Sequence, residues 1–103
     1  MEAEKTVEQA LKRTVEKAGG CCYKFTSPSR AGVPDRIVVL RGRVVFVELK
    51  ATGKKPRALQ KAIAKTIRKA GGRVYCLSSV EQATRFVQTL KRRYPLEEDY
   101  DNI

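Results

Sequence analysis

The chain has no histidine and no tryptophan, one methionine and only three cysteines among its 103 residues. Without histidine it cannot form a Ser-His-Asp triad, a Cys-His dyad or a histidine-ligated zinc site. The cysteines are Cys21, Cys22 and Cys76, an odd number without the paired C-x-x-C spacing of zinc sites. We therefore expect reduced thiols that pack as small apolar side chains, as is usual in the cytoplasm.

Long apolar runs are also missing. No stretch approaches the roughly 18 residues that a membrane-spanning helix needs, and the N-terminus has no apolar segment typical of secretory signals. No expected helix combines a large apolar face with a basic face, as helices on membrane surfaces do. We therefore expect a cytoplasmic protein without a membrane partner. Its length, with 42% apolar and 32% charged residues, indicates one folded domain.

Acidic residues are few and unevenly placed. The chain has 22 lysines and arginines against 11 acidic residues, and four of the acids lie in the last seven positions. We expect residues 1–95, with a net charge of +15, to form the domain and residues 96–103 to form an acidic, flexible tail. Such a basic body attracts polyanions, most often nucleic acid, although a charged surface that serves only solubility is the alternative.

Apolar spacing and turn residues predict the order α-β-β-β-α-β-α. Helices are expected at 2–18, at about 56–70 with Pro56 as the first residue, and from Ser79 onward, and strands at 22–25, 35–40, 43–49 and 73–77. The strands 35–40 and 43–49 carry apolar side chains on both faces, so both faces need cover. This predicts an α/β (α+β) fold with a central mixed sheet flanked by helices on both faces.

A two-residue turn at Arg41-Gly42 fixes the register of the central hairpin. Residue 40 then pairs with 43 and residue 37 with 46, so Asp35 stands opposite Glu48 with Cβ atoms about 5 Å apart. Two facing carboxylates repel unless a positive charge lies between them. Lys50 continues the Glu48 face, and this set of two acids and an amine suits Mg²⁺ that also accepts a phosphate.

An ordinary structural explanation for these residues also exists. Asp35 follows Pro34 and could be a turn residue, while Glu48 could form a common ion pair with Lys50 or Arg36. Against this, only seven acids precede the tail, and two of them occupy otherwise apolar β runs. Strands seldom take Asp or Glu without cause, which favours the metal site.

The segments G-V-P-D at 32–35 and E-L-K at 48–50 resemble the PD-(D/E)XK nuclease signature. With the preceding acidic helix, the following basic loop and the GGRVYCLSS segment, nearly the whole chain resembles the VRR-NUC domain (virus-type replication–repair nuclease). The resemblance implies a restriction-endonuclease-like αβββαβ core and a divalent-metal-dependent, structure-selective DNA endonuclease of the stand-alone phage or bacterial type. It further implies a homodimer that acts on branched DNA, such as Holliday junctions or flaps, in DNA repair, in the cytoplasm of a bacterium or phage-infected host.

The resemblance also implies roles for individual residues. Asp35, Glu48 and the Leu49 backbone carbonyl would hold Mg²⁺ or Mn²⁺, and Lys50 would position or polarise the attacking water. Gln60 would support the site or contact a phosphate, unless it is simply a solvated helix residue. No small-molecule cofactor is expected.

One acid from the first helix would complete the metal shell. Glu4 and Glu8 are four residues apart and share one helix face, so periodicity cannot choose between them. We prefer Glu8, because it lies about one turn closer to the sheet. Either could instead be an ordinary acid that faces solvent.

Basic residues near the motif are candidates for contacts to DNA phosphates, which fix register without reading sequence. They are Lys24, Arg30, Arg36, Lys54, Lys55, Arg57 and Lys61. The alternative to an enzyme is a non-catalytic, basic nucleic-acid-binding module with a nuclease-like fold. Such a module has no need for two facing carboxylates, which would repel phosphate without a metal, so the residues favour the enzyme.

Overall fold

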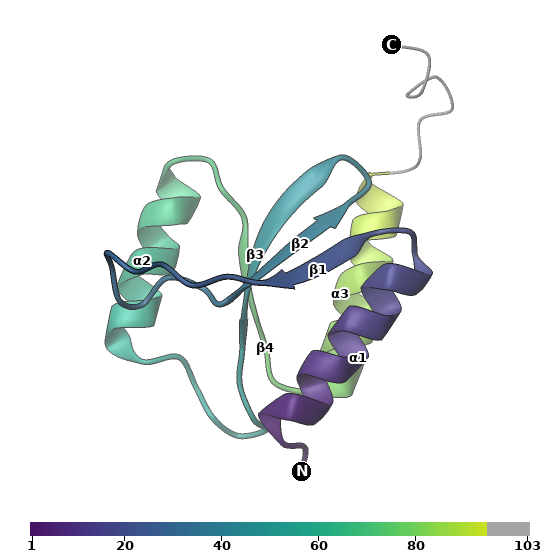
Figure 1. Cartoon of the computed structure of the whole chain (residues 1–103), viewed down its shortest axis with the longest axis horizontal. Helices are drawn as coiled ribbons and strands as arrows, with labels where there is room; N and C mark the ends of the chain where they lie inside the picture. Colours follow the sequence, from purple (N-terminus) through teal and green to yellow (C-terminus); the bar gives the residue numbers. More distant parts are fainter. Residues whose placement is uncertain (95–103) are drawn as a thin grey trace.

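The computed structural model describes residues 1–94, so the expected acidic tail at 96–103 lies outside the described residues. The expected order of elements is confirmed (Figure 1). The elements are α1 (Glu4–Lys17), β1 (Cys21–Lys24), β2 (Arg36–Leu40), β3 (Arg43–Leu49), α2 (Ala58–Lys69), β4 (Val74–Leu77) and α3 (Val80–Arg93). In this part of the chain, no helix is both long enough and apolar enough to span a bilayer.

The four strands form one mixed sheet, as the sequence predicts, and their order in it is β1-β2-β3-β4. The pairs β1–β2 and β2–β3 are antiparallel and β3–β4 is parallel, with α2 as the crossover that parallel neighbours need. The tight turn between β2 and β3 has positive φ at both Arg41 (56°) and Gly42 (77°), the signature of the preferred hairpin turns. The predicted register is confirmed, since Leu40 pairs with Arg43 and Ile37 with Phe46.

One face of the sheet is closed by α1 and α3, which lie side by side against it (Figure 1). Leu11 of α1, Val47 of β3 and Leu90 of α3 are among the fully or nearly fully buried side chains of this core. Burying each such side chain contributes about 1.5–3 kcal/mol, so this layer supplies most of the stability.

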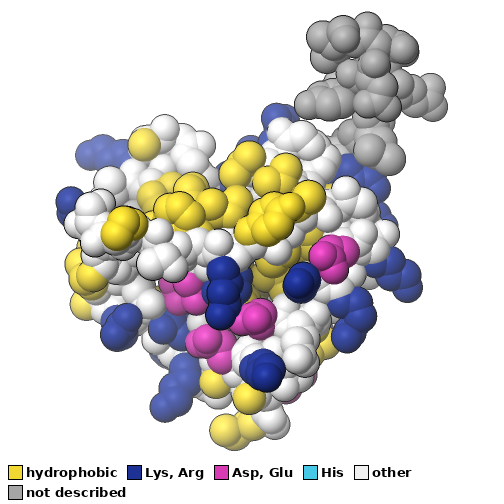
Figure 2. Space-filling model, viewed as in Figure 1, with side chains coloured by type: hydrophobic (Ala, Val, Ile, Leu, Met, Phe, Trp, Pro, Cys, Tyr) yellow, Lys and Arg dark blue, Asp and Glu magenta, His cyan; other side chains and the backbone are white. Residues whose placement is uncertain are grey.

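The other face is covered only in part. α2 lies over its β3–β4 end, which confirms helices on both faces, but no helix within residues 1–94 covers its β1–β3 part. Val39, Val44 and Tyr23 there expose 37%, 58% and 62% of their surface. Apolar side chains gather in the upper part of Figure 2, above a group of acidic and basic ones. Among residues 1–94, the face under α1 and α3, the closed face, is therefore buried, and the other, the open face, is partly exposed.

The start of α2 differs from the one expected, whereas the start of α3 agrees with it. α2 begins at Ala58 and not at Pro56, because Gln60 Oε1 accepts the Arg57 N–H at 2.8 Å and makes Arg57 the cap. Ser79 caps α3 as predicted, with its hydroxyl accepting the Gln82 N–H at 3.0 Å.

Of the three cysteine thiols, only Cys22 is buried, whereas Cys21 and Cys76 are exposed, so the expected apolar packing holds for one of three.

The chain before α1 is tied to two distant segments, in an arrangement that we call the N-terminal clamp. The Glu2 N–H donates to Thr52 Oγ1 at 2.9 Å, and the Thr52 N–H donates to the Glu2 carbonyl at the same distance. The Glu2 carboxylate accepts the Val80 N–H at 2.9 Å, while Thr52 Oγ1 donates to the Ser78 carbonyl. The clamp therefore joins the start of α1 to the turn after β3 and to the start of α3.

Candidate active site

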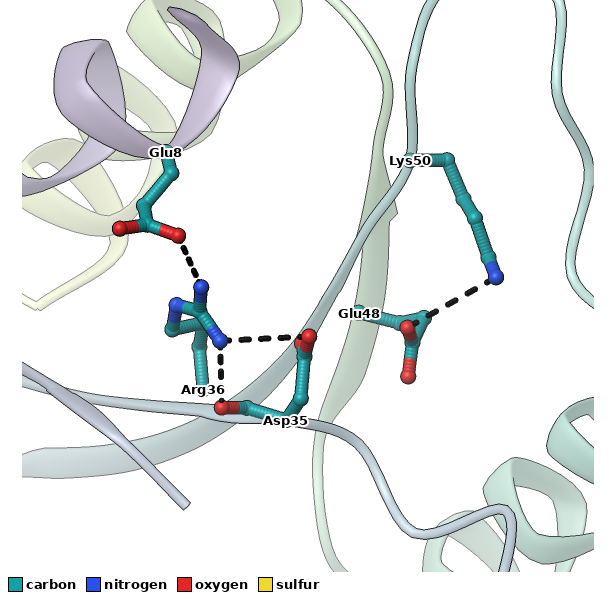
Figure 3. Close-up of polar contacts among 5 residues, drawn as sticks. All are labelled: Glu8, Asp35, Arg36, Glu48 and Lys50. Carbon is teal, nitrogen blue, oxygen red and sulfur yellow. Dashed lines mark hydrogen bonds and ion pairs between the residues drawn. The ribbon is translucent and has the colours of Figure 1, made fainter. Parts of the chain in front are cut away.

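The predicted acids lie where β2 begins and β3 ends. Arg36 pairs with Val47, so Asp35 is the next position on the one strand and Glu48 the next on the other. Pro34 is fully buried before Asp35, and the Asp35 carbonyl accepts the Phe25 N–H at 2.8 Å, so its backbone is fixed from both sides. Figure 3 shows the two carboxylates between Arg36 on one side and Lys50 on the other.

Glu48 is a buried carboxyl with an incomplete set of partners. It is 7% exposed, and its Oε2 lies 3.9 Å from Lys50 Nζ, beyond hydrogen-bond distance. Burial, and then the charge of Asp35, raise the pKa of Glu48 to about 7, and the nearby Lys50 charge offsets this only in part. The charge on Glu48 is therefore poorly compensated by the protein alone.

Asp35 has one satisfied and one unsatisfied oxygen. Its Oδ2 lies 3.2 Å from Arg36 Nη1, whereas Oδ1 is buried and has no hydrogen-bond partner. A buried acceptor without a partner costs about 1–3 kcal/mol, so such atoms need an explanation. Oxygen ligands of this kind suit a hard divalent cation, and an orphaned oxygen beside the poorly compensated Glu48 fits one.

Arg36 lies in a place that the sequence reasoning did not foresee. Its side chain is only 6% exposed, and its guanidinium forms ion pairs with Glu8 of α1 and with Asp35. Alternation along β2 places Arg36 on the closed face with Val38 and Leu40, which directs it toward α1. The side chain is therefore not on the surface, where a phosphate contact would lie, and instead positions two acids.

The two helix acids that periodicity could not distinguish have different surroundings. Glu8, the preferred candidate, is held by Arg36. Glu4, one turn earlier, lies near enough to Glu48 for its charge to be a minor cause of the raised Glu48 pKa, after burial and the charge of Asp35. Within residues 1–94, no group of three or more Asp, Glu or Cys side chains converges closely enough to hold a metal ion.

The remaining predicted residues fall into three environments. Gln60 is 8% exposed and uses its Oε1 to cap α2, so it is not a solvated residue. The Leu49 side chain is fully buried and anchors the end of β3, and the Lys50 N–H donates to the Leu77 carbonyl at 3.0 Å. The other basic candidates are exposed, namely Lys24, Arg30, Lys54, Lys55, Arg57 and Lys61.

The sequence reasoning missed a cavity of about 400 Å³ beside Glu48, between α2 and the sheet. Lys65, Arg68, Val74 and Cys76 line it together with residues already named. One signal was available, since Lys61, Lys65 and Arg68 follow the i, i+4, i+7 spacing of a single helix face.

Comparison with known proteins points to one family, although no family model matches the chain. A solved structure described as a VRR_NUC domain superposes with a TM-score of 0.73 and 31% sequence identity, covering 91% of this chain and 99% of that one. "Putative nuclease p44" of Acyrthosiphon pisum secondary endosymbiont phage 1 is 52% identical over 58 residues. That match covers 55% of this chain and 62% of the phage protein, less than two thirds of its length.

Proposed function

The chain belongs to the VRR-NUC domain family, and from that premise we propose that it is a nuclease that hydrolyses phosphodiester bonds in DNA with a divalent metal ion. The observation that carries the proposal is the orphaned Asp35 Oδ1 next to Glu48, whose pKa is raised to about 7. A non-catalytic binding module would carry an unsatisfied, repelling pair of acids that weakens phosphate binding. The named nuclease among the relatives supports the same activity.

Asp35 and Glu48, with the Leu49 carbonyl, would hold Mg²⁺ or Mn²⁺. For the helix acid we now propose Glu4 in place of Glu8, because Glu4 acts on Glu48 while Glu8 is paired with Arg36. When bound, the metal would polarise the phosphate and acidify a water molecule. Arg36 would hold Asp35 in place through its 3.2 Å contact and leave Oδ1 free for the cation.

Lys50 is proposed as the residue that orients the attacking water and steadies the charge on the phosphate. Its Nζ lies 3.9 Å from Glu48 Oε2, a distance that leaves its three donors available for other partners. Gln60 is proposed as a positioning residue, since it starts α2 beside Glu48 and thereby fixes the cavity wall.

We propose branched DNA, such as a junction or a flap of the kind handled in repair, as the substrate. The exposed basic side chains would contact its backbone, which gives affinity that falls steeply with salt and does not read bases. A homodimer is proposed from the same family resemblance, and the uncovered apolar part of the sheet, with Val44 58% exposed, supports it. Apolar surface of this kind is typical of protein interfaces.

The test is cleavage of end-labelled junction, flap and duplex DNA with Mg²⁺, with Mn²⁺ and with EDTA. We expect metal-dependent cutting that Asp35→Asn and Lys50→Gln abolish, while both variants still bind DNA. Glu81→Gln is the matched control, because Glu81 is an exposed acid whose one ion pair among residues 1–94 is with Arg85 of the same helix. Wild-type protein that binds these DNAs yet cuts none of them with either metal would establish the binding module instead.

A further inference from the structure

The cavity beside Glu48 has the size and construction of a ligand site. Its volume of about 400 Å³ falls within the range of pockets that take small ligands, roughly 300–1,000 Å³. One wall of the cavity is tightly packed, because Gly32 lies so close to α2 that a Cβ there would be 2.8 Å from Leu59 Cγ. The positive φ of Gly32, +87°, fixes the same loop in a conformation that other residues rarely adopt.

The chemistry of the cavity is divided between an apolar interior and a basic mouth. Pro34, Ala64 and Val74 supply apolar surface, and Lys61 and Lys65 are exposed on α2. Arg68 Nη2 donates to the Val74 carbonyl at 2.6 Å, which holds its guanidinium over the edge of β4. Within residues 1–94, none of these three basic side chains forms an ion pair with a carboxylate, so their charge is available to an anion.

A ligand with a flat apolar part and a phosphate would fit both the apolar interior and the basic mouth, and a nucleotide is such a ligand. We propose that the cavity takes one unpaired nucleotide of the substrate, with its base against the apolar interior and its phosphate at Lys61 and Lys65. Because Glu48 lines the same cavity, the neighbouring phosphate of that strand lies at the candidate metal site. The inference rests on the proposed nuclease function, and it identifies the unpaired nucleotide at a branch point as the part of the substrate that the cavity binds.

A nucleotide pocket of this kind predicts a preference for branched over plain duplex DNA. A base must leave its stack to enter, which costs a few kcal/mol in a duplex and least where the nucleotide is already unpaired. Duplex DNA would therefore contact only the basic mouth, while a flap or a junction would fill the interior as well.

Thiol protection tests this directly and needs no cleavage, since Cys76 is an exposed thiol that lines the cavity. The experiment uses the full chain with Cys21→Ser and Gln88→Cys, which places a control thiol on the exposed side of α3. With EDTA present and DNA saturating, flap DNA should slow alkylation of Cys76 by N-ethylmaleimide about tenfold, and duplex should slow it much less. Equal protection by flap and duplex, or none by either, would overturn the nucleotide pocket.

A filled cavity gives the second measurement. Ala64→Phe places a ring in the cavity, and Ala62→Phe, at an exposed position of the same helix, is its matched control. In EDTA, Ala64→Phe should weaken flap binding about tenfold and leave duplex binding and the thermal midpoint near those of the control. Unchanged flap binding would contradict the pocket even if wild-type protein cuts DNA, whereas selective loss would support it even if no cutting is found.

Discussion

The two faces of the sheet differ in what surrounds their side chains. On the closed face, α1 and α3 cover Val38, Val45 and Val47 completely. On the open face, α2 lies over the β3–β4 end of the sheet, and the cavity beside the facing acids lies between α2 and the sheet. The rest of this face carries the exposed side chains of Tyr23, Val39 and Val44, which we call the uncovered apolar band. The closed face supplies stability and the open face leaves groups unsatisfied, which indicates that binding is concentrated where packing is incomplete.

Arg36 is a buried charged residue on the closed face, and removing its charge should have the largest effect. Arg36→Gln removes the charged contacts to Glu8 and to Asp35, and because each such contact contributes about 1.5–3 kcal/mol, the loss of unfolding free energy should be about 3–5 kcal/mol. Urea denaturation measures this. Lys54→Gln, at an exposed position of the basic loop, is the control and should change little. An Arg36→Gln protein as stable as wild type would mean that the buried ion pairs do not support the fold.

Apolar truncations sharpen the same comparison. Leu11→Ala in the closed core should lose about 2–5 kcal/mol, because the surrounding helices cannot fully close the cavity that it leaves. Val44→Ala on the open face should change unfolding free energy by no more than about 0.5 kcal/mol, as exposed positions usually do. Both values come from chemical denaturation at protein concentrations low enough to keep the chain monomeric. Similar losses at the two positions would remove the distinction between the faces.

Metal binding should depend on pH through Glu48. Its pKa is raised to about 7, so the folded, metal-free protein holds a proton there below that pH and must release it to bind a cation. Calorimetric titration with Mn²⁺ should therefore show about tenfold weaker binding at pH 6 than at pH 8. Glu48→Gln, which removes this proposed ligand and its titration together, should bind Mn²⁺ weakly at both pH values.

The same shift affects stability with the opposite sign. Because the raised pKa favours neutral Glu48 in the folded state, metal-free protein should lose stability as the pH rises from about 4.5 toward 7. Thermal midpoints across this window, compared with those of Glu48→Gln, measure the effect. A wild-type midpoint that rises relative to the variant over the same window would contradict the shift.

The open face should also control assembly. Val44→Lys puts a charge into the uncovered apolar band and should shift the proposed dimer toward monomer in light scattering after size exclusion. Gln88→Lys on α3 is the matched control, since it adds the same charge at an exposed position away from the sheet. A variant that dimerises as wild type does would place the interface elsewhere.

Local signals account for what the sequence could predict. The turn residues Arg41 and Gly42 determine the hairpin register, and that register alone brings Asp35 opposite Glu48. Alternation along β2 gives the face on which Arg36 lies, but its pairing with Glu8, 28 residues away, depends on how α1 packs, and no local pattern reveals that partner. The choice between Glu4 and Glu8 cannot be made from the sequence for the same reason, because both satisfy the helix period and their surroundings differ only through packing. The cavity needs a loop, a helix and a strand together, and no single segment encodes it.

The N-terminal clamp affects the order in which the parts of the candidate site can come together while the chain is being synthesised. Glu2 contacts Val80, 78 residues later, and this contact anchors the start of the helix that carries Glu4. A nascent chain can form the β2–β3 hairpin early, since its contacts are local, but it cannot seat α1 until the start of α3 has left the ribosome. Glu4 would therefore join the facing pair of Asp35 and Glu48 only after the chain has been made as far as Val80.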